Sequence, residues 1–155
     1  MRVTYLSPLR VEAMENENTW RLLEDFKVQV DGGNPDPTIY IVPAGFMTDF
    51  ASVPQPFWII LPRWGKYGNA AVIHDYLYKV QTRSRRKADG IFREGMGVLA
   101  VPGWQIFCMY WAVRLLGWLA WQGSKRANKR GVIRIARILP EKSIEKAKTL
   151  RARQS

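Results

Sequence analysis

Histidine and cysteine are almost absent from this sequence, which has one of each among 155 residues, His74 and Cys108. A lone cysteine excludes an intramolecular disulfide, and zinc sites that need several His or Cys ligands cannot be assembled. A Cys–His hydrolase would need an exposed thiol, whereas the apolar neighbours of Cys108 favour burial. Two-carboxylate glycan cleavage by Asp89 with Glu94 or Glu24 is not selected by any spacing.

Acidic residues are few, 13 Asp or Glu against 24 Lys or Arg, and the formal net charge is +11. The segment 122–155 holds eleven of the basic residues and two Glu, so most of the excess charge lies there. Such a balance favours a polyanionic partner, either nucleic acid or an anionic membrane face. Non-specific nucleic-acid binding through this tail is one expectation, since no motif for reading a sequence accompanies the charges.

Long hydrophobic runs are missing as well. The apolar run from Trp104 is shorter than the roughly 20 residues of a spanning helix, and Arg114 interrupts it. The start of the chain turns polar at once, which predicts no signal peptide. The tryptophans of this run fit either a core helix or an interfacial helix whose indoles meet lipid headgroups.

The first half of the sequence predicts β structure. Two runs rich in Val, Ile and aromatic residues, "WRLLEDFKVQV" at 20–30 and "TIYIVP" at 38–43, flank the turn-forming "DGGNPDP". We therefore expect a β hairpin. The next stretch, 44–69, is rich in proline and glycine and predicts an ordered connecting segment.

The second half predicts helices. The apolar spacing indicates a helix over 69–80 with Asn69 as its N-cap, a second over 87–100 and a third over 104–122. A basic turn, "GSKRANKRG", should follow, then a strand or short basic helix and finally a solvated helix. The predicted fold class is α+β: an N-terminal β hairpin, a helical hairpin and a third apolar helix. One domain at 1–121 and a basic C-terminal extension at 122–155 are expected.

The only histidine lies in "AAVIHDYLYK". His74 and Tyr78 are four residues apart and share a helical face, whereas Asp75 is turned by about 100 degrees and should point elsewhere. An antiparallel second helix would bring Asp89 to the height of His74. The carboxylate would then fix the imidazole tautomer and leave the other nitrogen free to take a proton from water.

The pair "HDYLY" and "ADGIF" resembles the His-Asp-x-x-Tyr and Ala-Asp-x-x-Phe motifs of secreted and parvoviral phospholipases A2, over residues 69–93. The resemblance implies that His74 is the general base, that Tyr78 and Asp89 orient it, and that Asp75 ligates calcium. The substrate it implies is a membrane glycerophospholipid.

Calcium requires six to eight oxygen ligands, so Asp75 needs further donors. Compared with that family, "RWGKYGN" is the nearest candidate for a carbonyl-bearing calcium loop, with Gly65 and Gly68. Asp49 of "MTDFASVP" is a candidate for a further carboxylate.

A broader resemblance covers residues 20–121. "VPAGFMTDFASVP", "AAVIHDYLY", "KADGIF" and the tryptophan-rich helix are similar to an uncharacterised family of small phage and prophage proteins. This implies a tailed-phage origin, in which a lipid-cleaving protein would open the host membrane at entry or assist lysis. An anionic membrane phospholipid and other tail or virion proteins are the expected partners, and the location that the resemblance implies is a virion or the host cytoplasm.

A different class of function stays open. His74, Asp75, Asp89 and Asp49 could instead form a buried polar network in a non-enzymatic tail or virion component, where such a network selects one packing arrangement.

Overall fold

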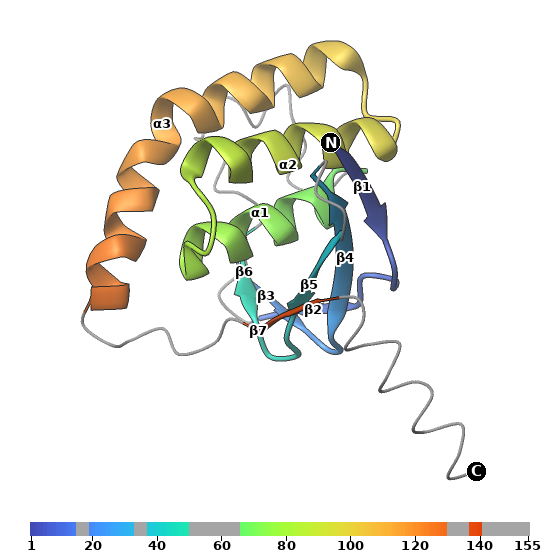
Figure 1. Ribbon diagram of the computed structural model, residues 1–155, viewed down its shortest axis with the longest axis vertical. Coiled ribbons are helices and arrows are strands. Elements are labelled where there is room, and N and C mark those ends of the chain that lie inside the picture. The colour runs from blue at the N-terminus through green and yellow to red at the C-terminus, as the bar shows by residue number, and fades with distance from the viewer. Residues whose placement is uncertain (15–18, 33–36, 50–65, 130–136, 141–155) are drawn as a thin grey trace, which may run out of the picture.

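Two small antiparallel sheets are built mainly from the N-terminal half of the protein (Figure 1). The computed structural model describes residues 1–14, 19–32, 37–49, 66–129 and 137–140. One sheet has the order β1-β4-β5-β7 and the other β2-β3-β6. The strands are β1 (Arg2–Tyr5), β2 (Val11–Ala13), β3 (Trp20–Leu22), β4 (Phe26–Asp31), β5 (Thr38–Val42), β6 (Met47–Thr48) and β7 (Arg137–Pro140).

The predicted hairpin is confirmed by β4 and β5. Phe26, Val28 and Val30 alternate with more exposed residues along β4, which is the period of two expected for a strand with one buried face. Val28 lies opposite Tyr40 in the antiparallel register, and both side chains are buried. This face therefore supplies one side of the hydrophobic core.

The single strand predicted over 20–30 is wrong. The segment forms two strands, β3 and β4, which are separated after Leu22 and belong to different sheets. Between the two strands, Leu23 is exposed. Asp25 Oδ1 accepts the N–H of Ala44, which connects this segment to the loop after β5. The apolar run thus serves two sheets. The strands β1 and β2 precede every element that the sequence pattern predicted.

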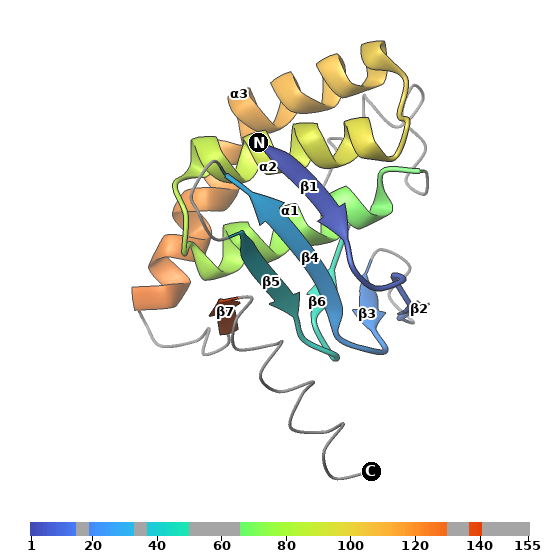
Figure 2. The same cartoon turned by 45° about the vertical axis from the view of Figure 1, so that its right-hand side comes forward.

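Three helices cover one side of the first sheet: α1 (Gly68–Val80), α2 (Arg85–Val98) and α3 (Gly103–Lys129). Helix α1 contacts β5 and β6, and α2 lies between β1 and α3. Figures 1 and 2 show the resulting layers, with the sheets on one side, the α1–α2 hairpin in the middle and α3 outermost. The architecture is α+β, as predicted.

The helix starts differ from the prediction. Tyr67, not Asn69, is the N-cap of α1, and it makes no side-chain capping bond. Helix α2 begins two residues earlier than predicted because Ser84 caps it, its side chain accepting the N–H of Lys87. Both expected helices are nevertheless present, and they form the predicted antiparallel pair.

Helix α3 continues through the predicted basic turn as far as Lys129, so that prediction is wrong over 123–129. Its second half is tied to the end of α1, because Gln81 Nε2 donates to the carbonyl of Trp121 at 2.7 Å. Asn128 Nδ2 likewise donates to the carbonyl of Lys79 at 2.8 Å. These tertiary bonds explain why a segment without apolar periodicity stays helical.

The expected boundary between domain and extension, 121/122, falls inside α3, and β7 returns to pair with β5. For the segment 132–140, a strand or a short basic helix was expected, and the structure has a strand there, β7. The predicted helix over 141–155 lies outside the described residues. Within the part of the chain that the structure describes, no helix has the length and apolarity to span a bilayer.

Candidate functional site

The α1–α2 hairpin brings together the three residues predicted to form the catalytic group. His74 Nε2 lies 3.1 Å from Asp89 Oδ1, and the hydroxyl of Tyr78 donates to the same oxygen at 2.7 Å. Asp89 is 0% exposed and His74 is 3% exposed. The predicted contact between Asp89 and the histidine ring is therefore confirmed, whereas the catalytic roles stay predictions.

A fourth residue, Arg114 of α3, completes this group and was missed in the sequence. Its Nη1 lies 2.6 Å from Asp89 Oδ2, which makes a short charge-assisted hydrogen bond. The sequence pattern showed Arg114 only as an interruption of an apolar run. A cation within an apolar run needs an acidic or polar partner, so the sequence did indicate that Arg114 has one. No spacing identified that partner as Asp89. We call His74, Tyr78, Asp89 and Arg114 the polar network.

The polar network determines which nitrogen of His74 carries the proton. Burial raises the pKa of Asp89, but the hydrogen bonds from His74, Tyr78 and Arg114 outweigh burial and hold this pKa below its ordinary value. An ionised carboxylate only accepts hydrogen bonds, so Nε2 of the ring must be the donor. In the neutral ring, Nδ1 then keeps the lone pair that can accept a proton.

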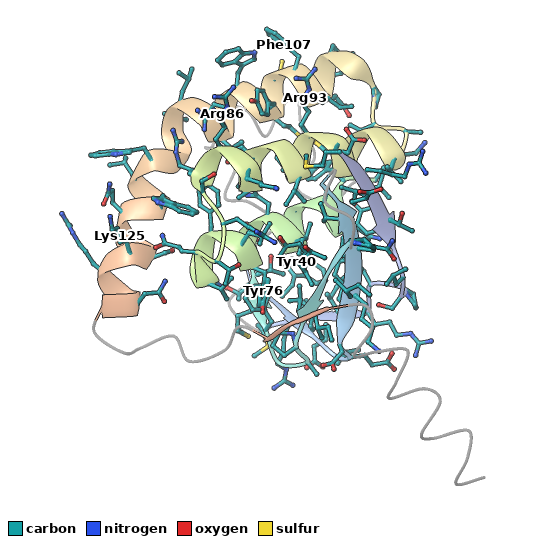
Figure 3. All side chains as sticks on the ribbon, viewed as in Figure 1. Tyr40, Tyr76, Arg86, Arg93, Phe107 and Lys125 are labelled. Atoms are coloured by element: carbon teal, nitrogen blue, oxygen red, sulfur yellow. The ribbon has the colours of Figure 1, made fainter. Side chains whose placement is uncertain are left out.

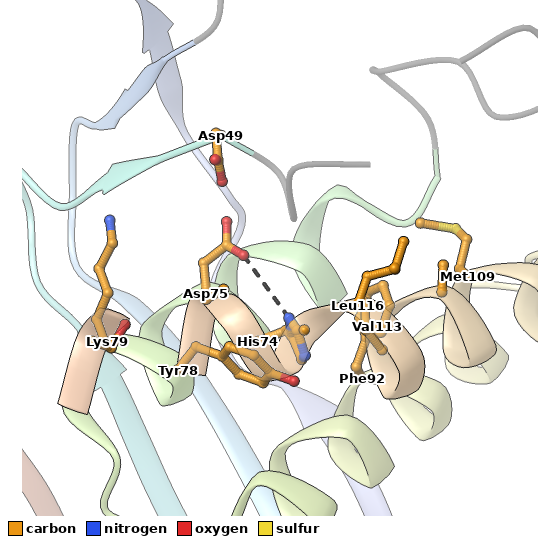
Figure 4. Close-up of a pocket in the computed structure, with 13 residues that line it drawn as sticks. Asp49, His74, Asp75, Tyr78, Lys79, Phe92, Met109, Val113 and Leu116 are labelled. Atoms are coloured by element: carbon orange, nitrogen blue, oxygen red, sulfur yellow. Dashed lines mark ion pairs between the residues drawn. The ribbon is translucent and has the colours of Figure 1, made fainter. Parts of the chain in front are cut away.

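The Nδ1 atom is buried and has no hydrogen-bond partner among the described residues. Asp75 Oδ1 lies 3.9 Å away, which is beyond hydrogen-bonding distance but close enough for a charge contact (Figure 4). The expectation that His74 and Asp75 would not contact each other is therefore wrong. Burial lowers the pKa of His74, but Asp75 and Asp89 together outweigh it and raise this pKa above its ordinary value.

A cavity of about 230 Å³ lies beside the ring. Its volume is several times the roughly 30 Å³ that one molecule occupies in liquid water, so it can hold a water and part of a substrate. The polar side of its lining includes His74, Asp75 and Tyr78 (Figure 4). The apolar side includes Phe92, Met109, Val113 and Leu116.

Two of the four predicted calcium ligands line this cavity. Asp49 and Asp75 come from different segments and lie near each other (Figure 4), and the hydroxyl of Thr48 donates to Asp75 Oδ2. Gly68 is the first residue of α1, about 10 Å along the helix axis from Asp75, and does not line the cavity. Gly68 thus lies outside the cavity lining, and its role as an ion ligand stays a prediction. Gly65 lies outside the described residues.

The described donors do not meet the requirement of calcium. The two carboxylates carry four oxygens, whereas calcium takes six to eight. Across the residues that the structure describes, no group of three or more His, Cys, Asp or Glu is placed to hold a metal ion. Calcium stays an expectation of the phospholipase resemblance, and we derive no chemical step through it.

The alternatives considered from the sequence do not assemble at this cavity. Cys108 is half-buried rather than buried, and the cavity lining does not include it. Glu24 forms an exposed ion pair with Arg10. Glu24 and Glu94 both lie outside the lining, so neither joins Asp89 in a two-carboxylate site.

Fold and site define an α+β protein in which a buried His–Tyr–Asp–Arg network adjoins a largely apolar cavity. The chain belongs to the family described as "Protein of unknown function (DUF1353)", whose sequence model matches residues 20–113. That range includes His74, Asp75, Tyr78 and Asp89 and ends one residue before Arg114.

One relative is the "Uncharacterized protein y4jT" of Sinorhizobium fredii (strain NBRC 101917 / NGR234), 41% identical over 86 residues. The alignment covers 54% of this chain and 26% of the relative, so the chain matches about a quarter of that protein's length. No solved structure matches the chain.

Proposed function

We propose that this protein is a phospholipase A2-like hydrolase that cleaves a glycerophospholipid ester with His74 as the general base. The observation that supports this is the state of Nδ1: it is unprotonated in the neutral ring, lacks a hydrogen-bond partner among the described residues and belongs to a side chain that lines the cavity. The polar network holds the ring in this orientation from the other side.

The proposed reaction begins when a water in the cavity attacks the carbonyl carbon of the ester. Nδ1 of His74 takes one proton from this water as the new carbon–oxygen bond forms. The tetrahedral intermediate then expels the glycerol oxygen, and the imidazolium returns its proton to that oxygen. A fatty acid and a lysophospholipid result, and the enzyme is restored. Asp89 stays ionised throughout and stabilises the positively charged ring.

The composition of the cavity supports a lipid substrate. Apart from Ser124, its side chains from α2 and α3 are apolar and suit an acyl chain. Since the sequence resembles phage and prophage proteins, we propose that the enzyme cleaves host membrane lipid at entry or during lysis.

The test is release of fatty acid from vesicles of mixed phosphatidylglycerol and phosphatidylcholine, measured by mass spectrometry with calcium and with a chelator. The full chain should release fatty acid, and His74→Asn should lower the rate about 100-fold or more, which is the usual contribution of a general base. Glu94→Gln, outside the cavity, is the matched control and should keep the wild-type rate.

Absence of release under both conditions would contradict the hydrolase. So would an unchanged rate in a folded His74→Asn variant. Release that persists in chelator would show that the chemistry does not require calcium, and release that calcium restores would support the expected ion.

A structural role in a tail or virion is the second candidate. The complete burial of Asp89, with three side chains bonded to it, favours this role, because a satisfied buried network rigidifies a fold. In that case His74→Asn would lower the melting temperature and impair particle assembly, and no preparation would release fatty acid.

A further inference from the structure

Helix α3 presents a row of large apolar side chains to solvent. They recur at intervals of three or four residues, so they share one face of the helix over about 21 Å. Leu115 is 72% exposed, and Phe107 points away from the body of the protein (Figure 3). Exposed apolar patches of this kind mark interaction sites. We call this row the outer face of α3: Trp104, Phe107, Trp111, Leu115 and Trp118.

Only cations accompany the outer face on its own helix. Helix α3 contains no Asp or Glu, and Lys125 and Arg126 are exposed near its end. On the neighbouring α2, Arg86 and Arg93 are exposed as well (Figure 3). Tryptophan and leucine with lysine and arginine beside them are typical of a helix that lies in the headgroup layer of an anionic bilayer. Each nearby cation adds attraction to the negative surface.

A second copy of the chain fits this surface less well. Two copies joined through their outer faces would bring the cations of both α2–α3 pairs together, and the acidic residues of these helices are only the buried Asp89 and the half-buried Glu94 of α2. Like charges placed opposite each other disfavour association. The charge therefore selects an anionic lipid surface over a self-complementary contact.

The outer face is also continuous with the cavity. Leu116 follows Leu115 on α3, is 47% exposed and lines the cavity. Leu119, one turn after Leu115, is exposed too. An apolar surface thus runs from the outer face to the cavity that His74 lines.

We propose that the outer face of α3 docks on an anionic phospholipid bilayer and places the cavity at the lipid surface. The delivery of lipid to His74 rests on the proposed hydrolase, whereas docking itself does not. Docking through this face supplies a lipid directly from the bilayer, so the substrate does not have to leave the membrane through water.

The experiment measures flotation of the full chain with vesicles of phosphatidylglycerol and phosphatidylcholine, against vesicles of phosphatidylcholine alone. The protein should bind the anionic vesicles more tightly, and added salt should weaken binding. The triple variant Trp104→Ser, Trp111→Ser, Trp118→Ser should lose affinity on the order of 100-fold, since three apolar anchors are removed. Leu6→Ser with Leu23→Ser, two exposed leucines elsewhere, is the matched control and should bind as the wild type does.

Unchanged vesicle binding by a folded triple variant would overturn the proposal. It would equally be overturned if light scattering showed a concentration-dependent dimer that the triple variant cannot form, with no binding to vesicles. Equal melting temperatures of the triple variant and the wild type show that the folded state is being compared.

A second substrate separates docking from hydrolysis. A short-chain phospholipid, dispersed as monomers, needs no docking, so the triple variant should cleave it at the wild-type rate while losing activity on vesicles. If the wild type floats with vesicles but cleaves neither substrate, the hydrolase fails and docking stands. If the wild type cleaves both and the triple variant does the same, docking fails and the hydrolase stands.

Discussion

The two sides of α3 differ in what surrounds them. Its inner side carries Arg114, which is bonded to the fully buried Asp89, and Gly117, which lies against Tyr78. Its outer face carries large apolar side chains in solvent. The difference indicates that substitutions on the inner side change the folded state and the cavity together, whereas substitutions on the outer face change binding alone.

The largest expected effect comes from Arg114→Met. The change leaves the carboxylate of Asp89 buried without its cation, and removal of one partner of a buried ion pair costs 3–5 kcal/mol. Because Arg114 is partly exposed, we expect a loss of about 3 kcal/mol in the free energy of unfolding, measured by urea denaturation. The double variant Arg114→Met, Asp89→Asn should lose less, since the buried charge is gone. A single variant as stable as the wild type would show that the inner side does not depend on this pair.

Two glycines of α3 offer a smaller, matched test. A Cβ on Gly117 would lie 2.7 Å from the hydroxyl oxygen of Tyr78, and that hydroxyl is held by Asp89. Gly117→Ala should therefore cost about 1–2 kcal/mol through overpacking. At Gly123 a Cβ would meet nothing within 4 Å, so Gly123→Ala should stabilise the helix by up to about 1 kcal/mol. Stabilisation by both variants would mean that Tyr78 does not pack closely on α3.

Lowering the pH should reduce the stability that the inner side of α3 contributes, because Asp89 is bonded there, and should leave the outer face unaffected. The folded state lowers the pKa of Asp89, so its contribution to stability is present above its unfolded pKa, about 4, and is lost as the pH falls through the folded value. We expect the free energy of unfolding to fall below pH 4 by about 1 kcal/mol per pH unit more steeply than in Asp89→Asn. Urea denaturation between pH 7 and pH 3 measures both slopes. Equal slopes would place the pKa of Asp89 at its unfolded value.

The local pattern was sufficient for the helical hairpin and for most of the polar network. Apolar spacing placed α1 to within a residue at its start, and the short connection required α2 to return antiparallel. From those two facts, the contact between His74 and Asp89 followed. The local pattern predicted one strand over 20–30, but this apolar stretch forms two strands that belong to different sheets, with the first ending at Leu22.

Two other failures have a tertiary cause. Helix α3 extends past its apolar run because Asn128 and Trp121 make hydrogen bonds to the end of α1. Arg114 reaches Asp89 from a different helix, 25 residues away in sequence, and no periodicity relates them. Contacts between distant segments determine both features.

The sequence by itself determined the fold class, the antiparallel helix pair and the side chains that face each other across it, because 3.6-residue periodicity and a short turn are local properties. Only the tertiary structure decided that Arg114 balances Asp89, that His74 lines a cavity with Asp75 beside its ring, and that Gly68 lies outside that cavity. These depend on how α3 crosses the hairpin, and the packing of whole elements sets that crossing.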